Sequence, residues 1–281
     1  MLKQLFVYIV LIVFAVVIWD LNDEYAEYIV IPGASSPTPP RQRRVHIMSF
    51  NVNALPDVVM LFRNKRAHAD KVVAFIEEHM GTYDVICLQE VFSNVLRPKL
   101  DKLFQAHGWT TCRENPTGLG IRPESGLYTA CRWGMTFSDR VVFSGEWVDA
   151  LARKGAMAVY IHGVNIRVIN VHLQDRHCDF MGTRISQIYD MRRKFGGGIY
   201  IGDFNEPDAA IRRDTYGKIL GRTCFPSTPT QTELNGNTYV LDGAFLPAYV
   251  QNETVEVVAC DVSDHRPIHI SFDTSQTSLP R

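Results

Sequence analysis

The stretch Gly198-Ile-Tyr-Ile-Gly-Asp-Phe-Asn-Glu-Pro207 places apolar residues between glycines and then stops at polar side chains. Its apolar part, Ile199 to Ile201, predicts a short buried strand. Asp203 and Asn205 follow directly. Both residue types are common in turns, and both also supply the oxygen atoms and hydrogen bonds of an active site. The stretch alone does not choose between these readings.

Similar endings recur along the chain. Polar residues that end, begin or directly precede other strand-like runs are Asn51, Glu90, His172, Asp242, Asp264 and His265. One such ending is ordinarily a turn, but turns do not explain a whole set made of Asn, Asp, Glu and His. If the strand ends converge, these side chains can hold a hard divalent cation and transfer protons through histidines. Metal-assisted hydrolysis of a phosphate ester suits such a set.

The chain beyond residue 44 alternates short apolar runs with a few helical stretches. Apolar spacing predicts helices over residues 65–80, 94–107 and 182–194. Strand-like runs occupy residues 45–50, 84–89, 126–131, 141–143, 156–161, 166–171, 199–201, 239–245, 255–258 and 268–272. Many strands and few helices predict an α+β fold, a two-sheet β-sandwich flanked by helices. The pattern indicates neither an internal repeat nor a second domain.

The N-terminus is uninterrupted apolar sequence from Leu5 to Trp19. We predict that an N-terminal hydrophobic helix over residues 1–22 acts as a single-pass signal anchor, a transmembrane helix. Lys3 precedes the run and Asp20 follows it. The positive-inside rule then places the rest of the protein in a lumen or outside the cell. A cleaved signal peptide with a secreted product, or a buried helix, are the alternatives.

The remaining chain divides by composition. Residues 23–44 include the Pro- and Ser-rich run 31–40 and are expected to be a linker. Residues 45–273 form the predicted catalytic domain, and residues 274–281 are a tail. The formal net charge of −1 gives no basic field that would indicate nucleic acid.

The cysteines give no sign of a zinc site, because the six of them are scattered without a CxxC pair. An even number suits an exported domain. Cys112 and Cys131 are placed to lie on neighbouring strands, although sequence leaves any pairing open. Asn252 to Thr254 is a glycosylation sequon, which is usable only in a lumenal or exported domain.

Five short motifs occur in a specific order: SFNVN, LQEVF, NVHLQ, GDFNEP and SDHRPI. In this order the chain resembles the endonuclease/exonuclease/phosphatase superfamily, the relatives of deoxyribonuclease I, over residues 45 to 272. The run Asn51 to Pro56, the pair Lys154-Gly155 and the HLQ of His172 are also similar to neutral sphingomyelinases, especially the secreted bacterial sphingomyelinase C group.

The resemblance implies a site for Mg²⁺, or for Mn²⁺ or another divalent cation. It makes Glu90 the principal ligand, with Asn51 beside it. Asp264 would complete the hydrogen bonding on the metal side. It also implies that Lys154 and Gln174 contact the substrate.

The resemblance implies catalytic roles as well. His265 matches the general base that takes a proton from the attacking water, and Asp242 would orient His265. Asp203 and Asn205 would position the water and a phosphoryl oxygen. His172 would stabilise the developing charge.

The expected activity is Mg²⁺-dependent hydrolysis of a phospholipid headgroup, sphingomyelin to ceramide and phosphocholine. A membrane-anchored or secreted nuclease of the same fold is the alternative. A phosphoinositide phosphatase would need a basic cluster that the sequence does not show, and a catalytically dead binding protein would lack site residues that are present. We expect a monomer that acts on a membrane phospholipid and not on nucleic acid. The chain departs from the bacterial enzymes in one respect. They carry an aromatic-rich hairpin near the C-terminus, whereas here the only aromatic residue in the corresponding span, residues 247–261, is Tyr249.

Overall fold

The computed structural model describes residues 27–33, 44–55, 64–115, 125–143, 153–176, 182–233 and 235–274. The predicted signal anchor, most of the linker and residues 275–281 lie outside these ranges. Among the residues described, no helix has the length and apolar character needed to span a bilayer.

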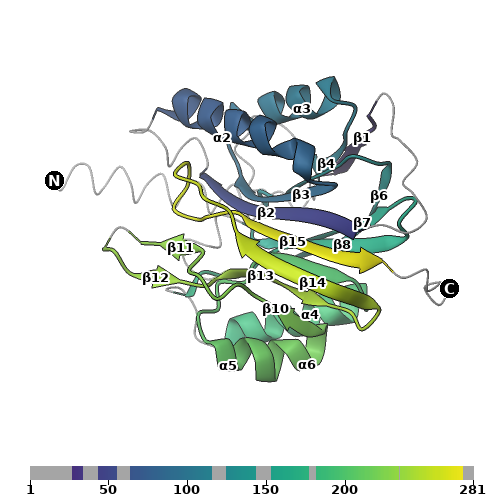
Figure 1. Ribbon diagram of the computed structural model, residues 1–281, viewed down its shortest axis with the longest axis vertical. Coiled ribbons are helices and arrows are strands. Elements are labelled where there is room, and N and C mark those ends of the chain that lie inside the picture. Colours follow the sequence, from purple (N-terminus) through teal and green to yellow (C-terminus); the bar gives the residue numbers. More distant parts are fainter. Residues whose placement is uncertain are drawn as a thin grey trace, which may run out of the picture.

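Two sheets face each other and form the centre of the molecule (Figure 1). The first sheet has the strand order β1 (Tyr28–Ile31), β4 (Thr110–Glu114), β5 (Tyr128–Cys131), β3 (Val85–Val91), β2 (Arg44–Ala54), β15 (Ile268–Thr274) and β14 (Val250–Val257). The second has the order β10 (Arg222–Cys224), β13 (Asp242–Leu246), β9 (Ile199–Asp203), β8 (Ile166–His172), β7 (Gly155–Ile161) and β6 (Met135–Val142). A separate hairpin pairs β11 (Gln231–Thr232) with β12 (Thr238–Tyr239).

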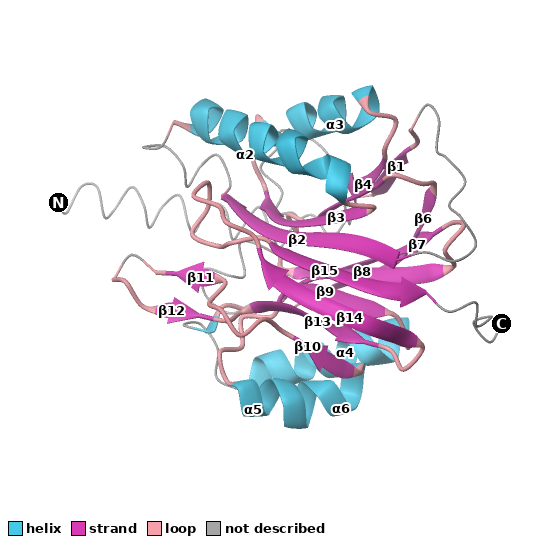
Figure 2. Ribbon diagram, in the orientation of Figure 1, coloured by secondary structure: helices cyan, strands magenta, loops and turns pink. Residues whose placement is uncertain are grey.

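Helices cover the outer face of each sheet (Figure 2). The helices over the first sheet are α2 (Lys65–His79), η1 (Met80–Thr82) and α3 (Leu96–Ala106), and those over the second are α4 (Gly182–Phe195), α5 (Ala209–Ile211), the π-helical turn η4 (Arg212–Tyr216) and α6 (Gly217–Leu220). Helix α2 begins where the side chain of Asn64 accepts a hydrogen bond from the Ala67 amide. The predicted α+β sandwich with flanking helices is therefore confirmed for the described part of the chain.

The sequences of the central strands are nearly continuous apolar runs because both faces of these strands are buried. Ile47 and Val85 on the first sheet belong to one buried cluster with Val168 and Ile199 on the second. The outer faces of the same strands are buried again, under the helices. A strand buried on both faces loses the polar alternation of a half-exposed strand.

Several elements differ from those predicted. Tyr28–Ile31, which we placed in the linker, is strand β1 paired with β4, and strand β4 itself was not predicted. The predicted strand over 239–245 divides into β12 and β13, and 141–143 is the end of the longer β6. Helices α5 and α6 were not among the predicted helices. Tyr28 is held by distant partners: its ring stacks on Phe137 with centroids 4.7 Å apart.

The described cysteines form no disulfide, so the open question of pairing is answered for these residues: Cys87, Cys112, Cys131, Cys224 and Cys260 are all free thiols. Cys112 and Cys131 do lie on neighbouring strands, β4 and β5. The two cysteines are not directly opposite each other, because Cys112 is paired with Thr129 and Cys131 with Thr110. Burial raises the pKa of the Cys112 thiol to about 12, so it behaves as a small apolar side chain.

Candidate active site

The register of the second sheet brings predicted site residues side by side. Gly155, next to Lys154, lies opposite His172. His172 in turn lies opposite Asp203, and Asp203 lies opposite Asp242. Each of these residues begins or ends its strand, so their side chains gather at one edge of the sheet. The predicted convergence of polar strand ends is present here.

The first sheet supplies Asn51 from β2 and Glu90 from β3. The pairing of these parallel strands shifts register between Asn51 and Ala54. At this irregularity the backbone φ angles are 48° at Asn53 and 58° at Glu90. Such left-handed conformations are uncommon outside glycine and concentrate at functional sites. The irregular pairing directs the carboxylate of Glu90 into a cavity instead of along the strand face.

A glycine immediately before Asp203 allows the central strands to approach closely. Gly202 has a φ of 150°, and a Cβ atom built there would lie 2.0 Å from the carbonyl oxygen of Val171. A side chain at this position would therefore separate β8 from β9. Gly202 keeps Asp203 beside His172.

A buried pair of amides joins the two sheets beneath the site. Gln89 Nε2 donates to Asn170 Oδ1 at 2.7 Å, and Asn170 Nδ2 donates to the carbonyl oxygen of Leu88 at 3.0 Å. Gln89 directly precedes Glu90, and Asn170 lies on β8 just before its end at His172. The bridge therefore fixes the two sheets where the site residues leave them.

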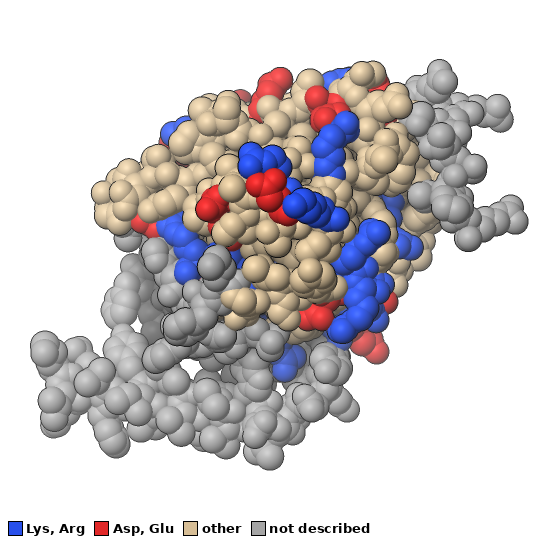
Figure 3. Space-filling view, turned by 90° about the horizontal axis from the view of Figure 1, so that it is seen from below, with Lys and Arg blue, Asp and Glu red and all other residues tan. Residues whose placement is uncertain are grey.

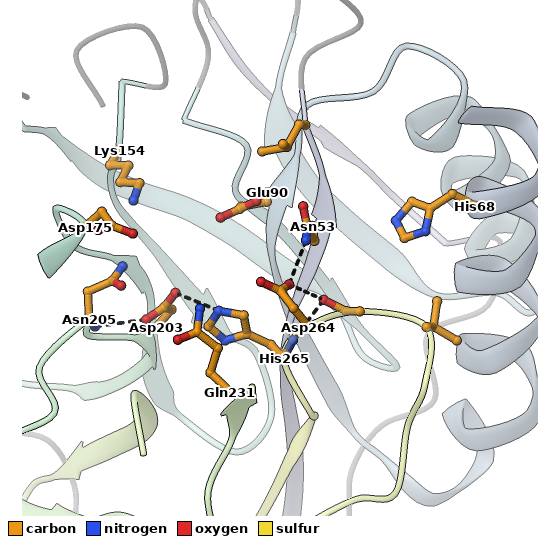
Figure 4. Close-up of a pocket in the computed structure, with 13 residues that line it drawn as sticks. Asn53, His68, Glu90, Lys154, Asp175, Asp203, Asn205, Gln231, Asp264 and His265 are labelled. Atoms are coloured by element: carbon orange, nitrogen blue, oxygen red, sulfur yellow. Dashed lines mark hydrogen bonds and ion pairs between the residues drawn. The ribbon is translucent and has the colours of Figure 1, made fainter. Parts of the chain in front are cut away.

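These strand ends line a cavity of about 480 Å³ (Figure 4). Its lining residues are Asn53, Leu55, His68, Glu90, Lys154, Asp175, Asp203, Asn205, Gln231, Val262, Ser263, Asp264 and His265. Nearly all are polar, and Leu55 and Val262 are the apolar exceptions. Asn51, His172 and Asp242 lie behind this lining and contact it through hydrogen bonds or close approaches.

His265 and Asp242 form a buried pair. Nδ1 of His265 lies 2.9 Å from Oδ2 of Asp242. Burial opposes a charge on His265, but the carboxylates of Asp242 and Asp203 outweigh burial and raise the pKa of His265 to about 10. Nε2 is the ring atom directed toward Asp203, at 3.8 Å. Asp242 thus fixes the ring and leaves Nε2 for proton transfer.

Asp203 lies at the centre of the group. Its Oδ2 accepts a hydrogen bond from Asn51 Nδ2 at 3.1 Å and lies 3.6 Å from His172 Nε2. Its Oδ1 accepts a hydrogen bond from the backbone N–H of Asn205 at 2.9 Å. Burial raises the pKa of Asp203, and the positive charge of His265 acts in the opposite direction.

Glu90, on β3 of the first sheet, places its carboxylate in the lining of the cavity. Its Oε1 accepts a hydrogen bond from Asn51 Nδ2 at 3.0 Å. Burial raises the pKa of Glu90, and nearby Lys154 acts in the opposite direction. In this arrangement Asn51 presents its amide nitrogen to both carboxylates, while its oxygen accepts from the Asn53 N–H at 3.1 Å. Asn51 thus acts here as a hydrogen-bond donor that gathers Glu90 and Asp203.

Asp264 is held on the opposite side of the cavity from Lys154 (Figure 4). Its Oδ1 accepts a hydrogen bond from Asn53 Nδ2 at 2.7 Å. The neighbouring Ser263 hydroxyl donates to the Asn51 carbonyl oxygen at 2.8 Å. These contacts tie the loop before β15 to the end of β2, so Asp264 and Glu90 line the same cavity.

His172 is fully buried, and neither of its ring nitrogens has a hydrogen-bond partner among the described residues. Burial, together with the positive charges of Lys154 and His265, lowers the pKa of His172 well below its usual value. A neutral buried imidazole without partners costs free energy. Its Nε2 lies 3.7 Å from Glu90 Oε1, which places it beside the cavity.

Among the predicted substrate contacts, Lys154 lines the cavity, whereas Gln174 does not. Gln174 is fully buried, and its backbone N–H donates to the side chain of Gln187 at 3.1 Å. Sequence reasoning did not single out Gln231, Asp175 or His68 as lining residues. The only local sequence feature that could have indicated Asp175 is its position directly after the NVHLQ motif. Gln231 lies on the short strand β11, which contains no recognisable motif.

Two sets of residues present oxygen and nitrogen atoms that are suitable for a metal ion. Asp203, Asp242 and His265 have candidate ligand atoms within 4.8 Å of one another. In this set, however, His265 Nδ1 is already bound to Asp242, so the group is better described as a proton-transfer pair with an adjacent carboxylate. Glu90 and Asp264 offer carboxylates to the open cavity, where a hydrated Mg²⁺ fits their chemistry.

Two arginine-rich segments, residues 192–194 on α4 and 212–213 on η4, do not line the cavity. They belong to the helical layer over the second sheet. On the face of this layer, Lys and Arg side chains are interspersed with Asp and Glu (Figure 3). Arg193 pairs with Asp190 at 2.8 Å, and Arg213 pairs with Asp214 at 2.8 Å. Arg193 and Arg213 therefore belong to a solvated, charge-paired surface, whereas Arg212 is itself buried.

The fold and the site together define a phosphoester hydrolase of the two-sheet sandwich type. The chain belongs to the Endonuclease/Exonuclease/phosphatase family, which it matches over residues 48–265. Comparison with curated proteins gives no significant match.

Solved structures with the same fold include a sphingomyelinase C, a beta toxin and TDP2. A sphingomyelinase C from Streptomyces griseocarneus is 15% identical with a TM-score of 0.62, covering 82% of this chain and 99% of the other. A beta toxin from Staphylococcus aureus with bound magnesium ions is 17% identical with a TM-score of 0.60, covering 81% and 99%. TDP2 from D. rerio, in complex with a single-strand DNA product, is 16% identical with a TM-score of 0.56, covering 82% and 99%. At these identities the likeness concerns the fold.

Proposed function

We propose that this protein is a Mg²⁺-dependent phosphodiesterase that hydrolyses sphingomyelin to ceramide and phosphocholine. The observation that carries the proposal is the convergence of Glu90, Asp264, Asp203 and the His265–Asp242 pair on one polar cavity. The choice of sphingomyelin is supported by the sequence motifs shared with neutral sphingomyelinases.

The donor set fits Mg²⁺, because Mg²⁺ prefers oxygen ligands and keeps several waters. Glu90 would be the direct ligand, with Asp264 and Asn51 beside it. When bound, the ion would neutralise charge on the phosphoryl oxygens and on the leaving oxygen. Burial raises the pKa of the Glu90 carboxyl, and a bound cation would favour its charged form.

The protein's own residues would supply proton transfer and orientation. In its neutral form, His265 Nε2 would take the proton of the attacking water, and the carboxylates that raise its pKa, Asp242 first, would stabilise the imidazolium that this step forms. Asp203 and Asn205 would orient the water and a phosphoryl oxygen from the end of β9. His172, held neutral by burial, would donate a hydrogen bond to the developing charge. Lys154 would add a positive charge at the cavity wall.

The character of the cavity supports a headgroup as the part of the lipid that enters. Its lining is polar apart from Leu55 and Val262, and a polar cavity does not solvate acyl chains. The chains would stay in the bilayer while the phosphodiester reaches the site. Tyr249 does not offer an interfacial aromatic, because its ring packs against the core between the sheets.

The proposed tether would compensate for the missing aromatic hairpin. We propose that residues 1–22 anchor the protein in the membrane, with the catalytic domain as a monomer in the lumen or outside the cell. A tether raises the effective concentration of the enzyme near lipid. Cleavage of this segment would instead release a secreted enzyme.

A comparison of substrates tests the proposed function. Purified protein is incubated with sphingomyelin, phosphatidylcholine and DNA, each with Mg²⁺ and with chelator. We expect phosphocholine release from sphingomyelin that requires Mg²⁺. Cleavage of DNA without cleavage of sphingomyelin would favour the nuclease alternative and reject the lipid substrate.

A further inference from the structure

The β11–β12 hairpin stands beside the site and makes contacts that the proposed reaction does not use. Its strands form a sheet of their own, separate from both layers. A hairpin with two-residue strands is not stable by itself in water. Contacts with the rest of the protein must therefore hold it in place.

One set of contacts joins the hairpin to the loop of Asp264 and His265. The Thr232 N–H donates to the Asp264 carbonyl oxygen at 3.0 Å, and the Arg266 N–H donates to the Thr230 carbonyl oxygen at 2.6 Å. Gln231 forms an isolated antiparallel bridge with His265. The hairpin and the catalytic loop are thus attached through their backbones.

Arg176 makes the second attachment, from the segment that follows His172. Its Nη1 donates to Gln231 Oε1 at 3.2 Å, and its Nη2 forms an ion pair with Glu233. Its guanidinium carbon lies 3.8 Å from the ring centroid of Tyr239. The side chain is 11% exposed. A planar guanidinium can hydrogen-bond and stack at once, so a single arginine contacts both strands and the turn side of the hairpin.

The contact with Arg176 determines how Gln231 faces the cavity. Gln231 lines the cavity with Asn205 and His265 (Figure 4). Because its carbonyl oxygen accepts the Arg176 hydrogen bond, its amide nitrogen is the end left to donate. A donor beside Asn205 and His265 lies where a phosphoryl oxygen of the substrate would be held.

We propose that Gln231 is a substrate-contacting residue that donates a hydrogen bond to a phosphoryl oxygen, and that Arg176 is the positioning residue that orients it. The inference rests on the proposed function in that it assumes a phosphodiester in this cavity. It does not depend on the lipid, since the phosphoryl oxygen is common to sphingomyelin and DNA. The contact is therefore tested on whichever diester the wild-type protein cleaves.

The decisive variant is Gln231→Glu, which keeps an acceptor for Arg176 but removes the donor. We expect Gln231→Glu and Gln231→Ala to lower kcat/KM by about 10- to 100-fold, the usual effect of losing a hydrogen bond to a charged group. Arg176→Ala should lower kcat/KM to a similar extent, and Arg176→Lys should recover part of the loss. The double variant Arg176→Ala/Gln231→Ala should be no worse than the worse single variant.

Controls separate this role from a structural one. Arg213→Ala removes an exposed arginine paired with Asp214, and Gln251→Ala removes an exposed glutamine on β14; both should keep wild-type kinetics. Thermal unfolding of Gln231→Glu should match wild type.

A wild-type value of kcat/KM in Gln231→Glu would overturn the inference. So would a loss of kcat/KM in the double variant equal to the product of the losses in the two single variants. A wild-type protein that cleaves only DNA would reject the lipid substrate alone, whereas one that cleaves no diester would reject both proposals.

Discussion

His265 Nδ1 lies 2.9 Å from Asp242 Oδ2, and both side chains are almost completely buried. Asp242 begins β13, next to β9, while His265 lies on the loop before β15 of the other sheet. The pair thus joins the two sheets through the catalytic group itself. The carboxylate of Asp242 therefore acts directly on the imidazole ring of His265.

Asp242→Asn should lower kcat by about 10²- to 10⁴-fold, the usual contribution of general acid–base catalysis. The amide keeps the shape of the side chain but removes the charge that supports His265. Steady-state kinetics on the cleaved substrate measures the effect. Asp273→Asn, which changes an exposed carboxylate on β15, is the control and should leave kcat unchanged.

Glu90→Gln should abolish Mg²⁺-dependent activity without unfolding the protein. The substitution removes the carboxylate that would bind the ion but keeps a side chain able to contact Asn51. Calorimetric titration with MgCl₂ should show binding to wild type and none to the variant. Glu77→Gln, an exposed change on α2, should titrate like wild type; equal binding by Glu90→Gln would reject Glu90 as the ligand.

His172→Leu should separate stability from activity. Both ring nitrogens of His172 are buried and have no hydrogen-bond partner in the part of the chain that the structure describes, so an apolar side chain of similar volume removes a cost of folding. We expect a free energy of unfolding equal to or above that of wild type, with kcat reduced by about 100-fold, within the range for one lost transition-state donor. Denaturant unfolding and kinetics on the same preparation give the answer. A destabilised but active variant would contradict this role.

Glu206→Gln should destabilise the protein although Glu206 lies outside the cavity lining. Its Oε2 accepts hydrogen bonds from Arg184 at 3.1 Å and Tyr216 at 3.2 Å, and all three side chains are buried. Breaking a buried ion pair leaves an uncompensated charge and costs about 3 kcal/mol or more. Denaturant unfolding measures the loss.

The matched control for this prediction is an exposed ion pair on the same helix as Arg184. Asp190→Asn removes the partner of Arg193 on α4, where the arginine is 83% exposed. The expected change is within about 1 kcal/mol. Equal effects of the two substitutions would contradict a stabilising role for the buried contacts of Glu206 with Arg184 and Tyr216.

Much of the site could be predicted because a polar residue at the end of an apolar run indicates a strand end in the sequence. Asp203, Glu90 and His172 each end an apolar run, and in this fold such ends meet at one edge. Gln231 could not be found this way, because its position comes from a short hairpin held by Arg176. Strand β1 was missed for a related reason: it is short, follows an apolar segment and precedes Pro-rich sequence, and its partner β4 is distant in the chain.

The detailed chemistry within the site also depends on tertiary structure. Sequence gave no indication that the Asn51 amide would face the carboxylates of Glu90 and Asp203 with its nitrogen. Nor could it show that Gln174, the last residue of the NVHLQ motif, is fully buried and does not line the cavity. Side-chain direction at a strand end depends on local backbone irregularity, such as that at Asn53 and Glu90.

The most direct measurement is phosphocholine release from sphingomyelin vesicles by wild type and Asp242→Asn, each with Mg²⁺, with chelator, and after Mg²⁺ is added back. We expect release by wild type that stops with chelator and returns with Mg²⁺, and release by the variant that is lower by about 10²-fold or more. Release that persists in chelator, or that is equal in the two proteins, would contradict a metal-dependent reaction in which Asp242 supports His265.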